Sequence, residues 1–305
     1  MKNLKKKTIR LFLLCLVILY ITNSFIDSFF EIYLRKYPDK SMEFYIIGFF
    51  NIISSISVIS IITVYFYKKM SEYFNEEMKN QMEKQNFLYS SIAHDIKTPM
   101  TLIKGYSDAL LNEKIKKEDL IQTYININTR TDQVTKLLEE LFEYSKLSMN
   151  TNNENFEDYN ISELLKDCII KNYDLIESKE MDLEVEIKDF VFLYIVTKDF
   201  KRMIENLIVN AVKHNEKNTK IRVGLYEYES HITISVSDMG ELISNEDKKK
   251  IFDPFVKKDE SRKTGKGSGL GLAIVKMIVE KHHGKISIED NYKGYNKAFI
   301  IRFNK

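Results

Sequence analysis

The chain has 305 residues, 30% of them charged and 44% hydrophobic, and its formal net charge is +2 at pH 7. Because 46 lysines and arginines are balanced by 44 acidic residues and form no basic stripe, nucleic-acid binding is not expected. The two cysteines favour neither a disulfide framework nor a thiolate metal site, since Cys15 lies in an apolar run and Cys168 in a predicted helix.

The first 67 residues predict two membrane-spanning helices. Residues 11–26 are almost wholly apolar, and residues 44–67 carry no charge, whereas a spanning helix needs roughly 17–25 such residues. We expect spans at about 9–30 and 44–67, joined by an outside loop over 31–43. A cleaved signal peptide is the alternative for the first span, but no small-residue cleavage site follows it.

Basic residues set the expected orientation of these spans. They precede the first span and follow the second, whereas the loop between the spans has mixed charge. The positive-inside rule therefore places both termini in the cytoplasm. The basic residues concerned are Lys2, Lys5, Lys6, Lys7 and Arg10 before the first span, and Lys68 and Lys69 after the second.

A helical hairpin is predicted beyond the membrane. Residues 68–85 are charged, contain no Gly or Pro, and indicate a signalling helix that continues from the second span. Residues 86–148 then predict two helices with a polar break at 112–117, because apolar residues recur at helical spacing on both sides of it. Such a slender hairpin cannot bury its apolar stripes alone, so dimerisation into a four-helix bundle is expected.

The remainder of the chain predicts an α+β sandwich over 158–305, after a polar linker at 149–157. Alternation of apolar and polar residues indicates the strands, and longer apolar periods indicate the helices. Helices are expected at 161–176, at 198–213 and after Gly271, and strands at 182–187, 191–195, 221–228, 231–237, near 286 and at 298–303.

The first motif that could carry out chemistry is Ala93-His94-Asp95-Ile96-Lys97-Thr98-Pro99. At about 100° per residue, His94 lies roughly 200° from Ile92 of the apolar stripe and should point to water, with Thr98 on the same face. A neutral imidazole can attack phosphorus, a neighbouring carboxylate can orient the ring, and Thr98 could hold a water for the reverse, hydrolytic reaction. Pro99 should bend the helix. For His94 taken alone, a solvated surface histidine before a kinked helix is the favoured alternative.

A second motif lies on the predicted helix at 198–213. Asn206 and Asn210 are four residues apart and share a face, with Lys213 close by. Two carboxamide oxygens can help to hold Mg²⁺ with nucleotide phosphates, to which a lysine adds positive charge. The alternative is an ordinary helix C-terminus, where Asn and Lys are common.

A third motif, Ser237-Asp238-Met239-Gly240, ends a predicted strand. Its carboxylate could accept a hydrogen bond from an adenine amino group, while Gly240 permits a sharp turn. The alternative is a plain strand-ending turn.

The fourth motif is the glycine-rich run from Gly265 to Gly271, which opens an apolar helix. Glycines allow backbone N–H groups to approach phosphate oxygens at a helix N-terminus. The spacing fits neither the dinucleotide fingerprint nor the P-loop, and a flexible loop is the alternative. Upstream, Phe252 and Phe255 should anchor a lysine-rich loop. The remaining histidines lack metal-ligand spacing, so a zinc site is not expected.

Together these motifs resemble those of bacterial transmembrane sensor histidine kinases of two-component systems. The likeness runs from about Phe87 to the C-terminus in the family's order: H box (94–99), N box (206–215), G1 box (238–240), F box (252–255) and G2 box (267–271). It implies a dimeric four-helix bundle followed by a GHKL-type (Bergerat) ATP-binding sandwich. It also implies a bacterial cell-membrane location.

The resemblance further implies residue roles. His94 would be autophosphorylated from Mg-ATP and would pass the phosphoryl group to an aspartate on the receiver domain of a cognate response regulator. Asp95 and Thr98 would support transfer and phosphatase activity. The implied ATP and Mg²⁺ residues are Asn206 and Asn210 for the metal (Asn210 the first choice), Lys213 and His214 for phosphates or ribose, Asp238 and Gly240 for adenine, and Gly267, Gly269 and Gly271 for the lid.

Three features depart from the family pattern. Leu242 stands where the G1 box usually has a second glycine, and Lys257 follows the F box where arginine is frequent. Residues 68–85 are too short for the usual HAMP relay, so the second span should couple directly to the bundle.

We therefore expect a homodimeric sensor kinase. Because the outside loop is too short to fold as a ligand-binding domain, its input should lie within the membrane: an envelope-active compound, a transporter partner or the lipid state. Two other functions stay open. One is a GHKL ATPase without phosphotransfer, which the H box disfavours. The other, suggested by Leu242, is an ATP-binding scaffold or phosphatase-only receptor without efficient autokinase activity.

Overall fold

The computed structural model describes residues 2–35, 42–149, 155–256 and 268–305. It divides into two units, Met1–Tyr89 and Ser90–Lys305.

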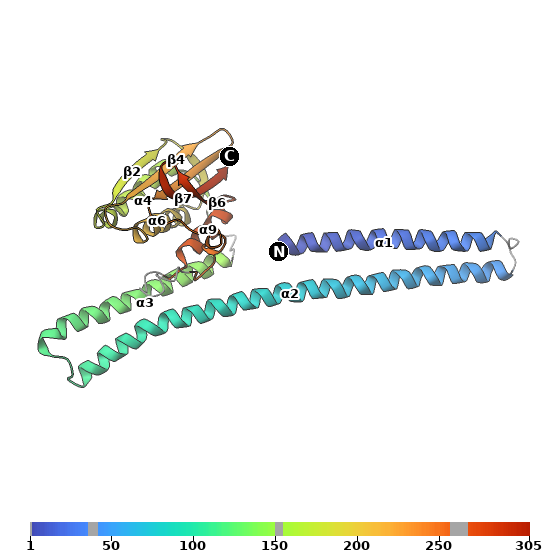
Figure 1. Cartoon of the computed structure of the whole chain (residues 1–305), viewed down its shortest axis with the longest axis horizontal. Coiled ribbons are helices and arrows are strands. Elements are labelled where there is room, and N and C mark those ends of the chain that lie inside the picture. Colours follow the sequence, from blue (N-terminus) through green and yellow to red (C-terminus); the bar gives the residue numbers. More distant parts are fainter. Residues whose placement is uncertain (1, 36–41, 150–154, 257–267) are drawn as a thin grey trace. The chain divides into compact units, whose positions relative to one another are not determined.

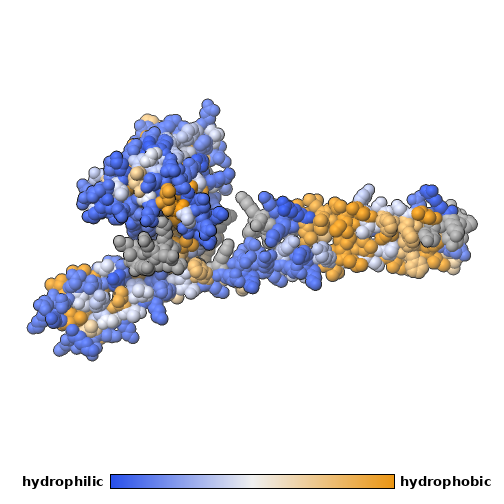
Figure 2. Space-filling model, viewed as in Figure 1, coloured by the Kyte–Doolittle hydropathy of each residue, from blue (hydrophilic) through white to orange (hydrophobic). Residues whose placement is uncertain are grey.

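The first unit consists of helix α1 (Lys2–Leu34) and the first part of helix α2 (Met42–Leu111). Each contains an 18-residue stretch with a mean hydropathy of 2.1, so both are long and apolar enough, by length and composition, to cross a membrane. Their apolar side chains are largely exposed, and Figure 2 shows them in orange along much of the two helices. The two helices contact each other through the rings of Phe12 and Phe66, whose centroids are 6.2 Å apart. A polar contact also joins them, since Asn51 Nδ2 donates to Asp27 Oδ1 at 3.4 Å.

Charged residues join the N-terminal end of α1 to α2 just beyond the apolar stretch. Lys7 Nζ lies 3.8 Å from Glu76 Oε2 and 5.3 Å from the centre of the Tyr73 ring. Lys69 Nζ lies 5.6 Å from the centre of the same ring. The two helices are therefore tied together near both ends of their apolar segments.

The second unit begins inside α2, at Ser90, and its first part is a helix–loop–helix. Helix α2 runs through residues 68–85, as predicted, and continues past Pro99 to Leu111. A short 3₁₀ helix, η1 (Lys117–Asp119), precedes α3 (Leu120–Ser148), so the predicted break and second helix are confirmed. A bend at Pro99 stays a prediction, but the proline does not end the helix.

A five-stranded mixed sheet follows (Figure 1). Strands β2 and β4 are parallel, and the other neighbouring strands are antiparallel. The order is β2 (Asp182–Ile187), β4 (Lys220–Glu227), β5 (His231–Asp238), β7 (Tyr295–Asn304) and β6 (Lys285–Tyr292). A separate pair is formed by β1 (Glu157–Asn160) and β3 (Phe192–Ile195).

Three helices cover one face of this sheet: α4 (Ile161–Lys171), α6 (Thr197–Lys213) and α9 (Gly271–Lys281). Alternate residues of the central strands face them and are buried, and Phe200 of α6 packs on Phe303 of β7 with ring centroids 5.6 Å apart. The core of the two-layer sandwich lies between these elements. Its sheet side includes Ile232, Ile234, Val236, Phe299 and Ile301.

Two predictions about secondary structure are wrong. The helix expected at 161–176 is interrupted at Asn172, where α4 ends, and α5 (Tyr173–Glu177) begins afterwards. Asn172 Nδ2 donates to the carbonyl of Cys168 at 2.8 Å, a side-chain bond that competes with helix continuation. The expected linker is also shorter, because Glu157 already pairs with Ile195 in the β1–β3 ladder. A further short helix, α7 (Asp247–Lys250), was not predicted.

Candidate functional site

The imidazole of His94 projects from α2 into solvent, with 81% of its side chain exposed. Its Nδ1 lies 3.6 Å from Asp95 Oδ1, close enough for the carboxylate to orient the ring electrostatically. Thr98 is also exposed, and its hydroxyl donates to the carbonyl of His94 at 3.3 Å, so both side chains share one face as predicted. A ring nitrogen here is accessible to an incoming phosphorus atom.

Asn206 and Asn210 lie on the side of α6 that faces away from its buried apolar residues. Both are half-buried, and Asn206 Nδ2 donates to the carbonyl of Gly271 at 3.4 Å. This contact brings the N box beside the start of α9, the helix that the glycine-rich run opens.

Lys213 and His214 end the same helix and are exposed. The backbone N–H of His214 donates to the carbonyl of Asn210 at 3.1 Å, which closes the last turn. Desolvation lowers the pKa of Lys213, and repulsion from Lys136 adds to that effect. Both side chains lie one helical turn from Asn210, a distance compatible with binding different parts of one nucleotide.

Asp238 ends β5 and is fully buried. Its Oδ1 accepts two hydrogen bonds, from the backbone N–H of Gly240 at 2.9 Å and from Lys297 Nζ at 2.5 Å. Its Oδ2 is buried and has no hydrogen-bond donor among the described residues. An unpaired buried acceptor is costly, and a ligand donor such as an exocyclic amine would satisfy it.

Lys297 was not predicted as part of the site. It lies on β7 and is itself buried. A signal existed in the sequence, since positions 297, 299, 301 and 303 share one strand face and only 297 is charged. That signal becomes meaningful only when β7 is paired with β5.

The glycine-rich run has a specific backbone requirement at Gly269, whose φ is +74°. Its carbonyl accepts a hydrogen bond from the N–H of Phe255 at 3.0 Å, which joins the F box to the G2 box. Phe255 is buried, and Phe252 packs edge-to-face on Phe299 with centroids 6.3 Å apart, so both predicted anchors contact the core. Gly267 lies outside the described residues, as does Lys257.

Leu242, which stands in place of the second G1 glycine, has 54% of its surface exposed. The next residue, Ile243, is buried and holds this segment against the domain. Leu242 therefore points outward rather than filling the space beside Asp238.

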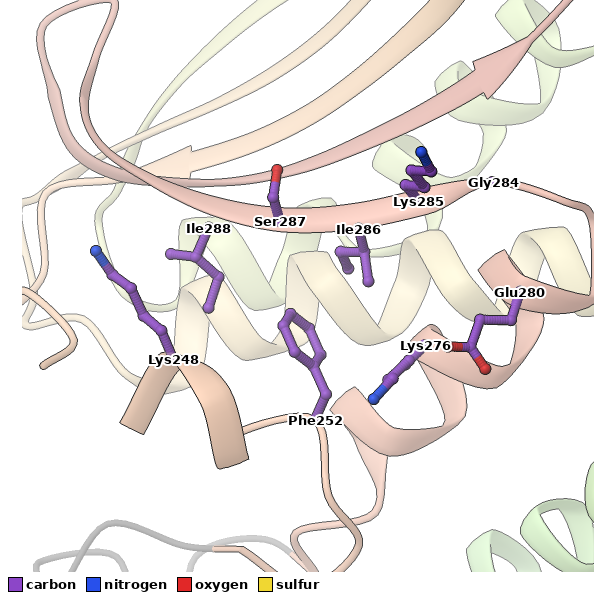
Figure 3. A pocket seen from close by; sticks show the side chains of 9 residues that line it. All are labelled: Lys248, Phe252, Lys276, Glu280, Gly284, Lys285, Ile286, Ser287 and Ile288. Atoms are coloured by element: carbon purple, nitrogen blue, oxygen red, sulfur yellow. The ribbon is translucent and has the colours of Figure 1, made fainter. Parts of the chain in front are cut away.

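A separate hollow of about 460 Å³ opens between β6, α9 and Phe252 (Figure 3). None of the predicted nucleotide-binding residues lines it, so it lies outside the candidate site. The lining residues are Lys248, Phe252, Lys276, Glu280, Gly284, Lys285, Ile286, Ser287 and Ile288.

His282 has a structural role. It is buried, its Nε2 accepts the N–H of Val196 at 3.0 Å, and its Nδ1 lies 2.7 Å from the carbonyl of Ile278. This pairing requires the neutral ring with its proton on Nδ1, and burial lowers the pKa of His282. Among the described residues, no group of three or more His, Cys, Asp or Glu side chains is arranged to hold a metal ion.

Comparison with known protein families assigns the helical hairpin and the sandwich that follows it. Residues 84–150 match the His Kinase A (phospho-acceptor) domain, and residues 195–305 match the histidine kinase-, DNA gyrase B- and HSP90-like ATPase. The first match contains His94, and the second contains the asparagines of α6 together with Asp238.

Several characterised proteins are similar to the chain. Sensor histidine kinase YcbM of Bacillus subtilis (strain 168) is 28% identical over 72% of this chain and 71% of its own length. Sensor protein SrrB of Staphylococcus aureus (strain MRSA252) is 29% identical over 76% of this chain, which spans only 40% of SrrB. The crystal structure of histidine kinase ThkA in complex with response regulator protein TrrA shares 25% identity and a TM-score of 0.59, covering 76% of this chain and 66% of that one. Acinetobacter baumannii AdeS, at 19% identity and a TM-score of 0.57 over 69% of this chain and 97% of its own, shares the fold. The two domain matches and the related sensor kinases identify this chain as a protein histidine kinase of the two-component type.

Proposed function

We propose that the chain is a membrane-bound, homodimeric sensor kinase that phosphorylates His94 from Mg-ATP and passes the phosphoryl group to an aspartate of a response regulator. The observation that carries this proposal is the exposed imidazole of His94 beside Asp95. The ATPase match implies a nucleotide that serves as donor. The partner class is supported by ThkA, which is seen in complex with its response regulator.

The transfer can be written with the ring in its Nδ1–H form, which Asp95 favours. The Nε2 lone pair of His94 attacks the γ-phosphorus of ATP, the bond to the β–γ bridging oxygen breaks, and ADP leaves with that electron pair. Asp95 stabilises the positive charge that develops on the ring, and the Nδ1 proton then passes to solvent. In the second step the N–P bond breaks as the regulator's carboxylate oxygen attacks, and His94 regains a proton.

Asn206 and Asn210 would hold Mg²⁺. Neutral carboxamide oxygens suit this ion when most of its other ligands are phosphate oxygens and water. Bound there, it would offset the negative charge of the phosphates during transfer. Thr98, on the same face as His94, would hold a water for the reverse, phosphatase reaction.

The dimer is supported by apolar side chains that a single hairpin leaves exposed. On α3 these side chains project at helical spacing, and they include Ile121, Ile125, Leu138 and Phe142. Pairing two hairpins into a four-helix bundle would bury them.

We further propose that residues 9–30 and 44–67 span the bacterial cell membrane with both termini in the cytoplasm. The exposed apolar surface of α1 and α2 and the flanking lysines support this topology. The input would act between the spans, where Asp27 and Asn51 meet, because polar groups within a membrane are costly and therefore mark functional sites. A transporter partner or an envelope-active compound would be the source of the signal.

The central test incubates the full chain, in detergent micelles, with Mg²⁺ and ATP labelled at the γ-phosphate. We expect acid-labile, base-stable label on the wild type and none on His94→Gln. His231→Gln is the matched control and should retain the label, because His231 lies on β5 and stacks on Tyr228. Label that persists on His94→Gln would contradict the proposal. Nucleotide binding without any label on the wild type would instead favour the scaffold or phosphatase-only function.

A further inference from the structure

We infer that Lys297 is a positioning residue for nucleotide recognition, which holds the carboxylate of Asp238 so that Oδ2 is presented to the exocyclic amine of the base. This inference rests on the proposed nucleotide-binding role of Asp238. It adds a residue from the last strand, about sixty positions away in the sequence, to the adenine-binding end of the site.

Strand pairing brings the two residues together. Asp238 and Lys297 are directly opposite in the antiparallel β5–β7 ladder, so their side chains lie on the same face. The neighbours on that face, such as Val236 and Phe299, are apolar and buried. A buried charge in such surroundings is unfavourable unless it is paired, and here each charged group compensates the other.

Lys297 has a second carboxylate nearby, that of Asp290, but Asp290 pairs with a different lysine. Asp290 of β6 stands opposite Lys297 on the other side of β7. Asp290 Oδ2 lies 2.5 Å from Lys248 Nζ. The two lysines therefore form separate ion pairs, Lys248 with Asp290 and Lys297 with Asp238. In the second pair Nζ lies 2.5 Å from Oδ1.

The two carboxylate oxygens of Asp238 differ in their hydrogen bonding. Oδ1 receives Lys297 Nζ and the N–H of Gly240, whereas Oδ2 is buried without a donor among the described residues. Asn215 is also buried, and its Nδ2 donates to the carbonyl of Ala211 at 2.5 Å, whereas its Oδ1 has no donor among the described residues. Two buried acceptors point to a ligand that supplies N–H groups.

The polar side chains of Asp238, Asn215 and Lys297 lie so close to Gly240 that no side chain fits at this position. A Cβ atom at Gly240 would collide with Asn215 Oδ1 and would lie 2.6 Å from Lys297 Nζ and 2.9 Å from Asp238 Oδ1. The three polar side chains therefore converge on the bare glycine. With Oδ1 fixed by Lys297, Oδ2 remains an acceptor and favours a base with an amino group at that edge over one without it.

The experiment measures the binding of two nucleotides to the full chain in detergent micelles by isothermal titration calorimetry. One is ADP, and the other is purine riboside 5′-diphosphate, which lacks only the 6-amino group. A hydrogen bond to a charged group supports a loss of at least about tenfold on removing the amine from the wild-type complex. In Lys297→Met, we expect the same removal to cost about twofold, because the carboxylate is no longer held.

A purely structural role for Lys297 would weaken both nucleotides by the same factor, and an unchanged ratio would overturn the inference. Lys248→Met is the matched control, since it removes the neighbouring lysine–aspartate pair and should leave the tenfold ratio intact. If Lys297→Met lacks a folded near-ultraviolet circular dichroism spectrum, Lys297→Gln replaces it with the same readout. A wild type that binds both nucleotides equally would refute the role of Asp238 itself, so the two failures are distinguishable.

Discussion

Replacing Gly269 by alanine should disrupt the junction between the F box and the G2 box. Gly269 has a φ of +74°, a conformation that costs an L-residue about 1–2 kcal/mol. An added Cβ would also lie 2.9 Å from the Cα of Phe255 and 3.1 Å from the carbonyl oxygen of Val256. Both are backbone atoms that cannot rotate away, and such overpacking costs about 1–3 kcal/mol.

Together these costs amount to about 2–5 kcal/mol, and the lower limit corresponds to a loss of about 30-fold in an equilibrium constant. If the junction opens in the free variant, re-forming it around ADP costs this free energy, and we therefore expect Gly269→Ala to weaken ADP binding about 30-fold. Gly271→Ala is the comparison within the same motif. Its Cβ would lie 3.8 Å from the Asn206 side chain, an ordinary contact, so its effect should stay within about threefold.

Calorimetric titration of ADP into each full-length variant in detergent micelles measures both values. Near-ultraviolet circular dichroism verifies that the variants are folded. Equal losses for the two substitutions would refute the reasoning, because only Gly269 combines a positive φ with a close backbone neighbour.

Three further predictions concern other parts of the chain. Leu242→Gly should change ADP affinity by less than about threefold, since the side chain is exposed, and a larger change would show that Leu242 acts on the site. Burial lowers the pKa of His282 below its usual 6.5, so the unfolded chain binds the extra proton and stability should fall as the pH drops below about 6.5. Thermal unfolding of His282→Gln should show a smaller pH dependence, and an unchanged slope would contradict this. Asp27→Leu removes the contact with Asn51 and should shift the basal labelling of His94 in lipid vesicles by about three- to thirtyfold; identical labelling would exclude a role for the contact.

Elements with a strong local period were predictable from the sequence. The strand at 182–187 and the helix ending at Lys213 follow the prediction closely. For the helix the reason is that its apolar spacing directly reflects which face is buried. The exposure of His94 was predictable for the same reason, since it follows from its angle to the apolar stripe.

Features that depend on distant pairing or on side-chain hydrogen bonds were not predictable in this way. Strand β1 is polar and forms only because β3 lies beside it. The break at Asn172 depends on a side-chain bond to Cys168 rather than on the apolar period. Lys297 gains its significance from the register of β7 against β5.

The pairing of β1 with β3 also determines how far the ATP-binding sandwich can travel from the hairpin. Helix α3 ends at Ser148 and β1 begins at Glu157, so the covalent tether between them has a contour length of about 30 Å. A tether this short keeps the nucleotide at a local concentration in the millimolar range around the hairpin. In the proposed homodimer, the first phosphoryl transfer would then depend on chain geometry rather than on kinase abundance. A cell with few dimers would phosphorylate each one as rapidly as a cell with many.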